Sequence, residues 1–200
     1  NIDYLCQKSP NTCRNFSEMS FSQNLKNPTS KIIQTGNPVR NLVSKHAELL
    51  TEAQAFFHLD SSKKTILVIG GSLGARTLNE SVLNHIQTLV ASNVQVIWQC
   101  GKNYLSQIEE QFEDSWKSTA QVHAFIQRMD LAYASADVII SRAGALSVSE
   151  LTLIGKPCIL VPSPNVAEDH QTKNAMALVQ QDAAMLVTDA QSKETLVPTA

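Results

Sequence analysis

Residues 65–76 read Thr-Ile-Leu-Val-Ile-Gly-Gly-Ser-Leu-Gly-Ala-Arg. The first five residues predict a buried strand, and the glycine-rich segment leads directly into a stretch with apolar residues at helical spacing. Such a turn lets backbone N–H groups and a helix dipole approach an anion. Its glycine spacing fits neither the dinucleotide fingerprint nor a P-loop. Taken alone, it is either an anion-binding turn or simply a tight turn.

The same alternation of short strands and longer amphipathic stretches continues along the chain. Apolar residues recur at helical spacing within 78–90, 105–112 and 175–179. The strands are nearly continuous in Val, Ile and Leu, as expected for parallel strands buried on both faces. We therefore predict an α/β fold with a Rossmann-like, doubly wound parallel sheet. The predicted strands are Thr65–Ile69, Val94–Gln99, Gln121–Phe125, Asp137–Ser141, Cys158–Val161 and Ala184–Val187.

Composition excludes several classes of protein. The 200 residues are 43 % hydrophobic and 17 % charged, with a net charge of −2, so we expect a folded protein and no nucleic-acid partner. The longest apolar runs fall far short of the roughly 20 residues that cross a bilayer. The four cysteines are too scattered for a disulfide scaffold, and Cys100 and Cys158 lie in apolar, strand-like surroundings where we expect buried thiols.

Two further polar segments follow predicted strands. In Ile140-Ser-Arg-Ala-Gly-Ala-Leu-Ser-Val-Ser-Glu150, hydroxyls and N–H groups at a helix start suit a phosphate, and Glu150 suits ribose hydroxyls or is only a favourable helix-start acid. In 161–174, His170 is either a general base or, as we favour, a surface residue. Because the carboxyl ends of parallel strands share one edge, all three segments are expected to converge on one crevice.

Four segments together resemble the MurG family: Thr35-Gly-Asn-Pro-Val-Arg40, Ile69-Gly-Gly-Ser-Leu-Gly-Ala-Arg76, the run Ser141–Glu150, and Asp169-His-Gln-Thr-Lys-Asn174. That family consists of inverting GT-B glycosyltransferases with two Rossmann-like domains. They transfer GlcNAc from UDP-GlcNAc to lipid I, giving lipid II for peptidoglycan. The resemblance covers about residues 31 to 190 and implies the C-terminal, donor-binding half of a hexosyltransferase.

The resemblance also implies roles for individual residues. Ser72 would lie beside the donor diphosphate, backbone groups of Ile126 would read the uracil edge, Glu150 would bind the ribose, and Gln171, beside His170, would bind the GlcNAc hydroxyls. Ser147 stands where the family commonly has Thr, which keeps the hydroxyl. The complete set of implied UDP-GlcNAc contacts is Arg40, Ser72, Ile126, Ala145, Leu146, Ser147, Val148, Ser149, Glu150 and Gln171.

The resemblance divides the chain and leaves part of the reaction outside it. Residues 1–30 would be a linker or the tail of an N-terminal acceptor domain, and 31–200 the donor-binding domain, truncated at its C-terminus. The catalytic base, the lipid I pocket and the membrane-facing patch would belong to the missing domain, so this piece would transfer no sugar by itself. No cofactor is expected, and the lack of any Asp-x-Asp pair agrees with a metal-independent site. The whole enzyme would lie peripherally on the cytoplasmic face of the bacterial plasma membrane.

Two other interpretations share these motifs. One is a nucleotide-sugar-binding module, or the donor subunit of a split GT-B enzyme. The other is a UDP-GlcNAc 2-epimerase or a related nucleotide-sugar enzyme, against which the Ser141–Glu150 and Thr35–Arg40 segments argue.

Overall fold

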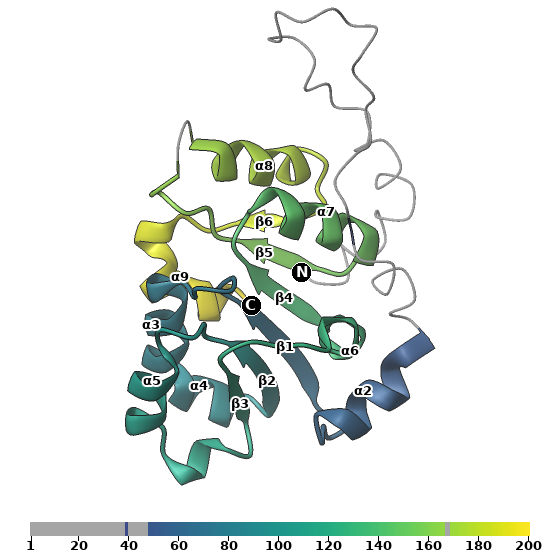
Figure 1. Ribbon diagram of the computed structural model, residues 1–200, viewed down its shortest axis with the longest axis vertical. Helices are drawn as coiled ribbons and strands as arrows, with labels where there is room; N and C mark the ends of the chain where they lie inside the picture. Colours follow the sequence, from purple (N-terminus) through teal and green to yellow (C-terminus); the bar gives the residue numbers. More distant parts are fainter. Residues whose placement is uncertain (1–38, 40–47, 167–168) are drawn as a thin grey trace, which may run out of the picture.

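The computed structural model describes residues 39, 48–166 and 169–200 (Figure 1). Strands and helices alternate along this part of the chain. The strands are β1 (Lys64–Ile69), β2 (Val94–Gln99), β3 (Ala120–His123), β4 (Val138–Ser141), β5 (Cys158–Leu160) and β6 (Met185–Leu186). The helices are α2 (Leu50–Phe56), α3 (Arg76–Asn84), α4 (Ile86–Ala91), α5 (Leu105–Gln111), the short η5 (Asp114–Trp116), α6 (Met129–Ser135), α7 (Ala145–Ile154), α8 (His170–Val179) and α9 (Asp189–Thr199).

The six strands form one parallel sheet in the order β3-β2-β1-β4-β5-β6. The chain moves outward from β1 to β3, returns to the centre, and then builds β4, β5 and β6 on the other side. At the centre β1 pairs with β4, and Ile69 lies opposite Ser141 at the ends of the two strands. The predicted doubly wound sheet is confirmed, and its order reverses between β1 and β4.

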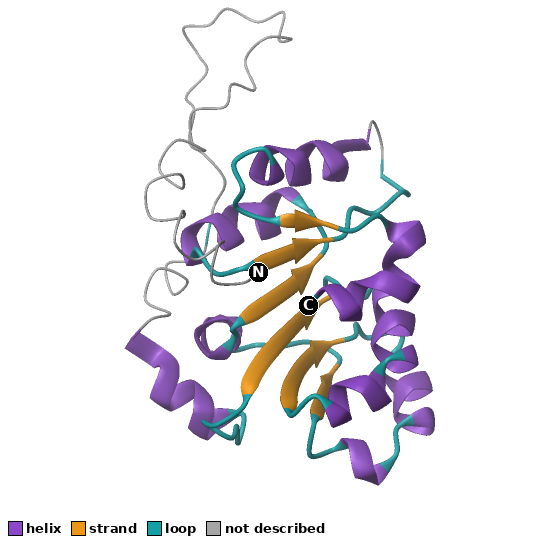
Figure 2. Ribbon diagram, turned by 180° about the vertical axis from the view of Figure 1, so that it is seen from behind, coloured by secondary structure: helices purple, strands orange, loops and turns teal. Residues whose placement is uncertain are grey.

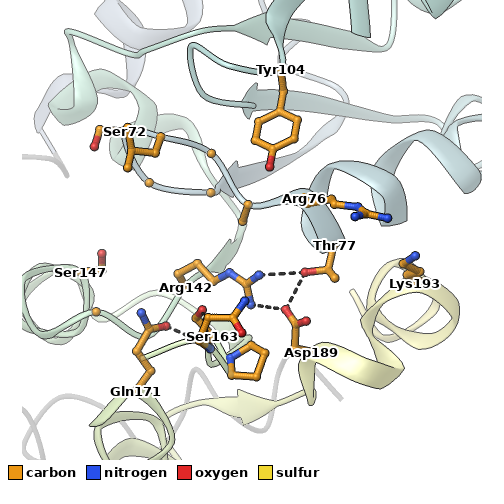
Figure 3. Close-up of a pocket in the computed structure, with 18 residues that line it drawn as sticks. Ser72, Arg76, Thr77, Tyr104, Arg142, Ser147, Ser163, Gln171, Asp189 and Lys193 are labelled. Atoms are coloured by element: carbon orange, nitrogen blue, oxygen red, sulfur yellow. Dashed lines mark hydrogen bonds and ion pairs between the residues drawn. The ribbon is translucent and has the colours of Figure 1, made fainter. Parts of the chain in front are cut away.

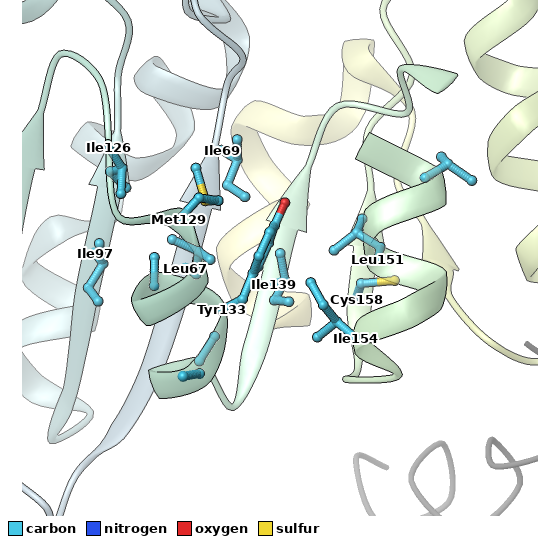
Figure 4. Close-up of a cluster of buried hydrophobic side chains, with 14 of the residues drawn as sticks. Leu67, Ile69, Ile97, Ile126, Met129, Tyr133, Ile139, Leu151, Ile154 and Cys158 are labelled. Carbon is cyan, nitrogen blue, oxygen red and sulfur yellow. The ribbon is translucent and has the colours of Figure 1, made fainter. Parts of the chain in front are cut away.

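Helices cover both faces of the sheet (Figures 1 and 2). Side chains alternate along β1: Ile66 and Val68 pack with α3, α4, α5 and α9, whereas Leu67 and Ile69 pack with α2, α6, α7 and α8. Figure 4 shows the cluster that contains Leu67 and Ile69. In this cluster Ile139 of β4 packs with Tyr133 of α6 and Leu151 of α7. The central strands β1, β4 and β5 are therefore buried on both sides, as their sequence predicted, whereas the edge strand β6 is partly exposed at Met185.

The predicted elements differ from the observed ones mainly at their ends. The strand expected over 121–125 ends at His123, because the N–H of Ile126 bonds to a side chain, Gln99 Oε1, and not to a neighbouring strand. The helical stretch 78–90 is divided at His85 into α3 and α4. The last helix begins at Asp189, where an acid in the first turn favours a helix start. The 1–30 segment lies outside the described residues.

Two glycines bring the turns after β1 and β2 into direct backbone contact. Gly74 has φ of +85° and Gly101 has φ of +91°, a region that other residues rarely adopt. A Cβ on Gly101 would lie 2.2 Å from the Gly74 nitrogen, and a Cβ on Gly74 would lie 2.1 Å from the Cys100 carbonyl oxygen. The glycine-rich turn after β1 therefore packs so closely against the turn after β2 that there is no space for a side chain at either glycine.

We expect Gly101→Ala to destabilise the fold, because the new Cβ meets both the positive φ and the Gly74 backbone. The free energy of unfolding, measured by urea denaturation, should fall by about 2–4 kcal/mol. Gly144→Ala is the matched control, since Gly144 has an ordinary φ of −64° and its Cβ would lie 3.8 Å from the nearest atom. The control should lose less than about 1 kcal/mol, and equal losses in the two variants would show that the contact is not tight.

Candidate functional site

A cavity of about 690 Å³ opens at the carboxyl edge of the sheet, where the strand order reverses (Figure 3). Ligands of open α/β sheets bind at this position. Its walls come from the turn after β1, the starts of α3 and α7, the loop after β5, and α9. The lining residues that carry polar side chains are Ser72, Arg76, Thr77, Tyr104, Arg142, Ser147, Ser163, Asn165, Gln171, Asp189 and Lys193.

Two helices begin at the cavity. The residue before α3 is Ala75 and the residue before α7 is Gly144, and neither helix receives a side-chain cap. The first N–H groups of an α-helix have no partner within the helix, and the macrodipole places partial positive charge there. Both starts lie on the cavity wall. The arrangement suits an anion such as a phosphate group.

Arg142 joins the elements around the cavity. Its guanidinium, 14 % exposed, donates to the carbonyl oxygens of Val161 (3.1 Å) and Pro162 (3.2 Å) and to Thr77 Oγ1 (2.8 Å). It also pairs with Asp189 of α9 at 2.5 Å, and Thr77 donates to the same carboxylate at 2.6 Å. The loops after β4 and β5 are thereby fixed to α3 and α9 (Figure 3).

A second ionic group lies at the rim. Arg76 of α3 and Lys193 of α9 both pair with Glu80, at 2.7 and 2.5 Å. Hydrogen bonds from Arg76 and then from Lys193 hold the pKa of the Glu80 carboxyl below its ordinary value. Two cations share one carboxylate here, so the rim carries excess positive charge, which again favours an anion.

The structure brings three of the predicted side chains together in the cavity: Ser72, Ser147 and Gln171. Gln171 Oε1 accepts a hydrogen bond from the Ser163 N–H at 2.9 Å, which fixes the amide plane. Ala145 and Leu146 are exposed at the start of α7, and His170 is the first residue of α8 and is also exposed. Arg40 lies outside the described residues.

Other predicted residues do not line the cavity and make contacts within the protein. Glu150 is 3 % exposed and accepts a hydrogen bond from Tyr133 Oη at 2.9 Å. Val148 is buried in the core, and Ser149 Oγ donates to the Ala145 carbonyl at 2.9 Å. Whether these residues, or any of the predicted set, contact a ligand stays a prediction.

Ile126, expected to read a base edge through its backbone, donates its N–H to Gln99 Oε1 at 2.9 Å. The Nε2 of Gln99 donates to the Gly71 carbonyl at 3.1 Å. One buried amide therefore connects the segment proposed for the base with the turn proposed for the diphosphate.

Sequence reasoning gave no role to Arg142, Asp189 or Lys193. Arg142 stood inside a quoted motif, and the only signal was a cation directly after a buried strand. Asp189 and Lys193 belong to no motif, and their partners lie far away in sequence. Gly101 was missed for the same reason, because a single glycine after a strand does not reveal the backbone that it touches.

Two kinds of feature are absent from the described residues. Within 39, 48–166 and 169–200, no three His, Cys, Asp or Glu side chains gather as metal ligands would. None of the helices described there is long and apolar enough to span a bilayer.

Cys100 and Cys158 are buried, as predicted, and burial raises the pKa of the Cys100 thiol to about 11, so it stays protonated near neutral pH.

Residues 65–199 match the glycosyltransferase family 28 C-terminal domain. Among curated relatives, proteins of Parabacteroides distasonis and Flavobacterium psychrophilum are 54 % and 53 % identical over 173 and 169 residues. Both are named UDP-N-acetylglucosamine–N-acetylmuramyl-(pentapeptide) pyrophosphoryl-undecaprenol N-acetylglucosamine transferase. The matches cover 86 % and 82 % of this chain but 47 % and 44 % of the relatives, so the chain spans about half their length.

Solved structures agree with the sequence comparison. The crystal structure of Acinetobacter baumannii MurG is 28 % identical, with a TM-score of 0.63, over 86 % of this chain and 49 % of that one. The glycosyltransferase SnogD from Streptomyces nogalater, 14 % identical with a TM-score of 0.52 over 72 % of this chain and 38 % of that one, shares the fold. With two thirds of its length matched to the family's C-terminal domain, the chain belongs to glycosyltransferase family 28.

Proposed function

We propose that this chain is the donor-binding half of a hexosyltransferase that transfers GlcNAc from UDP-GlcNAc to a lipid-linked acceptor in peptidoglycan synthesis. The observation that carries the proposal is the cavity at the reversal of strand order, with two uncapped helix starts on its wall. The names of relatives at 50–54 % identity give the donor, the sugar and the acceptor class.

In the proposed complex the diphosphate lies between Ser72 and the first turn of α7, formed by 145–147. The GlcNAc hydroxyls face Gln171, the ribose faces Glu150 and the uracil faces the backbone at Ile126. Arg40 is proposed as a further donor contact. The support is that Ser72, Ser147 and Gln171 line the same cavity.

The chemistry proposed for this half is stabilisation of the leaving group. When the bond between the sugar and the diphosphate breaks, negative charge develops on the departing UDP. Helix starts and hydroxyls already aimed at that position stabilise it without reorganisation. Deprotonation of the acceptor hydroxyl needs a base, which we place in the part of the enzyme beyond this chain, together with the lipid I pocket. We further propose that the whole enzyme works at the cytoplasmic face of the bacterial plasma membrane.

Ser72→Val tests the diphosphate position. The substitution removes a hydroxyl and adds two methyl groups at the cavity wall, so UDP should bind at least about tenfold more weakly, and uridine less than about twofold more weakly. Isothermal titration of the 200-residue chain measures both. Ser92→Val is the control, because Ser92 is exposed at the end of α4 and bonds only locally, to Thr88. Equal weakening of the two ligands would place the diphosphate elsewhere.

The proposed position of the catalytic base outside this chain gives a second prediction. The 200-residue chain should bind UDP-GlcNAc but release no UDP when a soluble lipid I analogue is added, because the base is proposed to lie outside it. The full-length P. distasonis relative serves as the positive control in the same UDP-release assay. Sugar transfer by the 200-residue chain alone would contradict the proposal and place a base within this chain.

A further inference from the structure

A hydrogen bond between two buried side chains joins α6 to α7, the helix whose start lies on the cavity wall. Tyr133 of α6 is 2 % exposed and Glu150 of α7 is 3 % exposed, and Tyr133 Oη donates to Glu150 Oε2 at 2.9 Å. In Figure 4 the Tyr133 ring lies between α6 and β4, and its oxygen points toward the carboxyl end of that strand. That is the edge at which the cavity opens.

The Tyr133 ring is held firmly by packing. All seven residues of α6 are buried, and the ring belongs to the same cluster as Met129, Ile139 and Leu151. Its hydroxyl therefore has a fixed position. The torsion that orients a Glu carboxylate is intrinsically broad, so a hydrogen-bond donor in a fixed position at 2.9 Å helps to set the plane of the Glu150 carboxylate.

The apolar surroundings of Glu150 also explain why its carboxylate needs a hydrogen-bond donor. A carboxylate is costly to bury in apolar surroundings unless donors face it. Val148 and Leu151, on the same helix as Glu150, are buried in the core that contains Tyr133. A carboxylate accepts up to about four hydrogen bonds, so it can hold Tyr133 together with other donors.

We infer that Tyr133 is a positioning residue that sets the plane of the Glu150 carboxylate for the vicinal hydroxyls of a ribose, and so makes the site select ribonucleotides over 2′-deoxyribonucleotides. The inference rests on the proposed function, in which Glu150 faces the ribose. Two hydroxyls on adjacent carbons donate to one carboxylate only when its plane matches theirs. With the carboxylate turned away, the 2′-hydroxyl contributes little to affinity.

A structural role alone would give a different result. Loss of the buried Tyr133 hydroxyl would then lower the stability of the chain and weaken all nucleotides alike. A positioning role changes the ratio of two affinities, that for UDP and that for 2′-deoxy-UDP. These ligands differ only in the hydroxyl that the carboxylate is proposed to bind.

The test compares UDP and 2′-deoxy-UDP by isothermal titration on the 200-residue chain. For the unmodified chain we expect UDP to bind about tenfold more tightly, and for Tyr133→Phe less than about threefold more tightly. Ser135→Ala is the matched control, since it removes another buried hydroxyl from α6, one that bonds to the Ala132 carbonyl. The control should keep the tenfold ratio. If Tyr133→Phe does not fold, Tyr133→Met removes the same hydroxyl with a side chain that adapts to irregular space.

Glu150→Gln separates the possible failures. We expect it to abolish the preference for UDP, and the double variant with Tyr133→Phe to show no further change. If Glu150→Gln lowers the ratio and Tyr133→Phe leaves it at tenfold, the positioning role is overturned while the ribose contact stands. If UDP binds but Glu150→Gln leaves the ratio unchanged, the ribose placement is wrong and the role of Tyr133 falls with it. If the unmodified chain binds neither nucleotide, the proposed function itself is overturned.

Discussion

The common direction of the six strands is the constraint on which the site depends. Crossover connections between parallel strands are right-handed, so moving outward from β1 and moving outward from β4 place the connecting helices on opposite faces. The turns after β1 and β4 therefore diverge, and a space remains between them at the carboxyl edge. The same polarity directs the starts of α3 and α7 to that edge. The cavity and its favourable potential for anions both follow from the sheet.

The ionic groups around this space have two different functions. Arg142 and Asp189 are mostly buried and neutralise each other, and their bonds attach α9 to the centre of the site. Arg76 and Lys193 share Glu80 and are 72 % and 45 % exposed, so their charge acts through water and is screened by salt. Arg142 and Asp189 hold the elements of the site in place, whereas Arg76 and Lys193 contribute a diffuse positive potential.

The sequence predicted the elements whose pattern is local. Runs such as Thr65–Ile69 are recognisable because both faces are buried, and the glycine-rich turn is visible from composition alone. The sequence did not predict helix α6, because all seven of its residues are buried and the helix therefore has no polar face and no amphipathic period. Contacts that join distant parts of the chain, such as Arg142 with Asp189 and Gly101 with Gly74, leave no local pattern. Roles for single residues came from the chemistry of the motifs and from the resemblance, not from periodicity.

Buried polar side chains connect the parts of the proposed donor site. Gln99 uses both ends of its amide, toward Ile126 and toward Gly71, and Tyr133 holds the carboxylate of Glu150. Each of these groups lies on a strand or helix with a packed apolar neighbourhood. A buried amide or carboxylate has few alternative partners, so leaving its bond unmade costs more than the bond itself contributes in water. The segments that would face uracil, diphosphate and ribose are therefore fixed relative to one another before any nucleotide arrives, which lowers the ordering cost of binding.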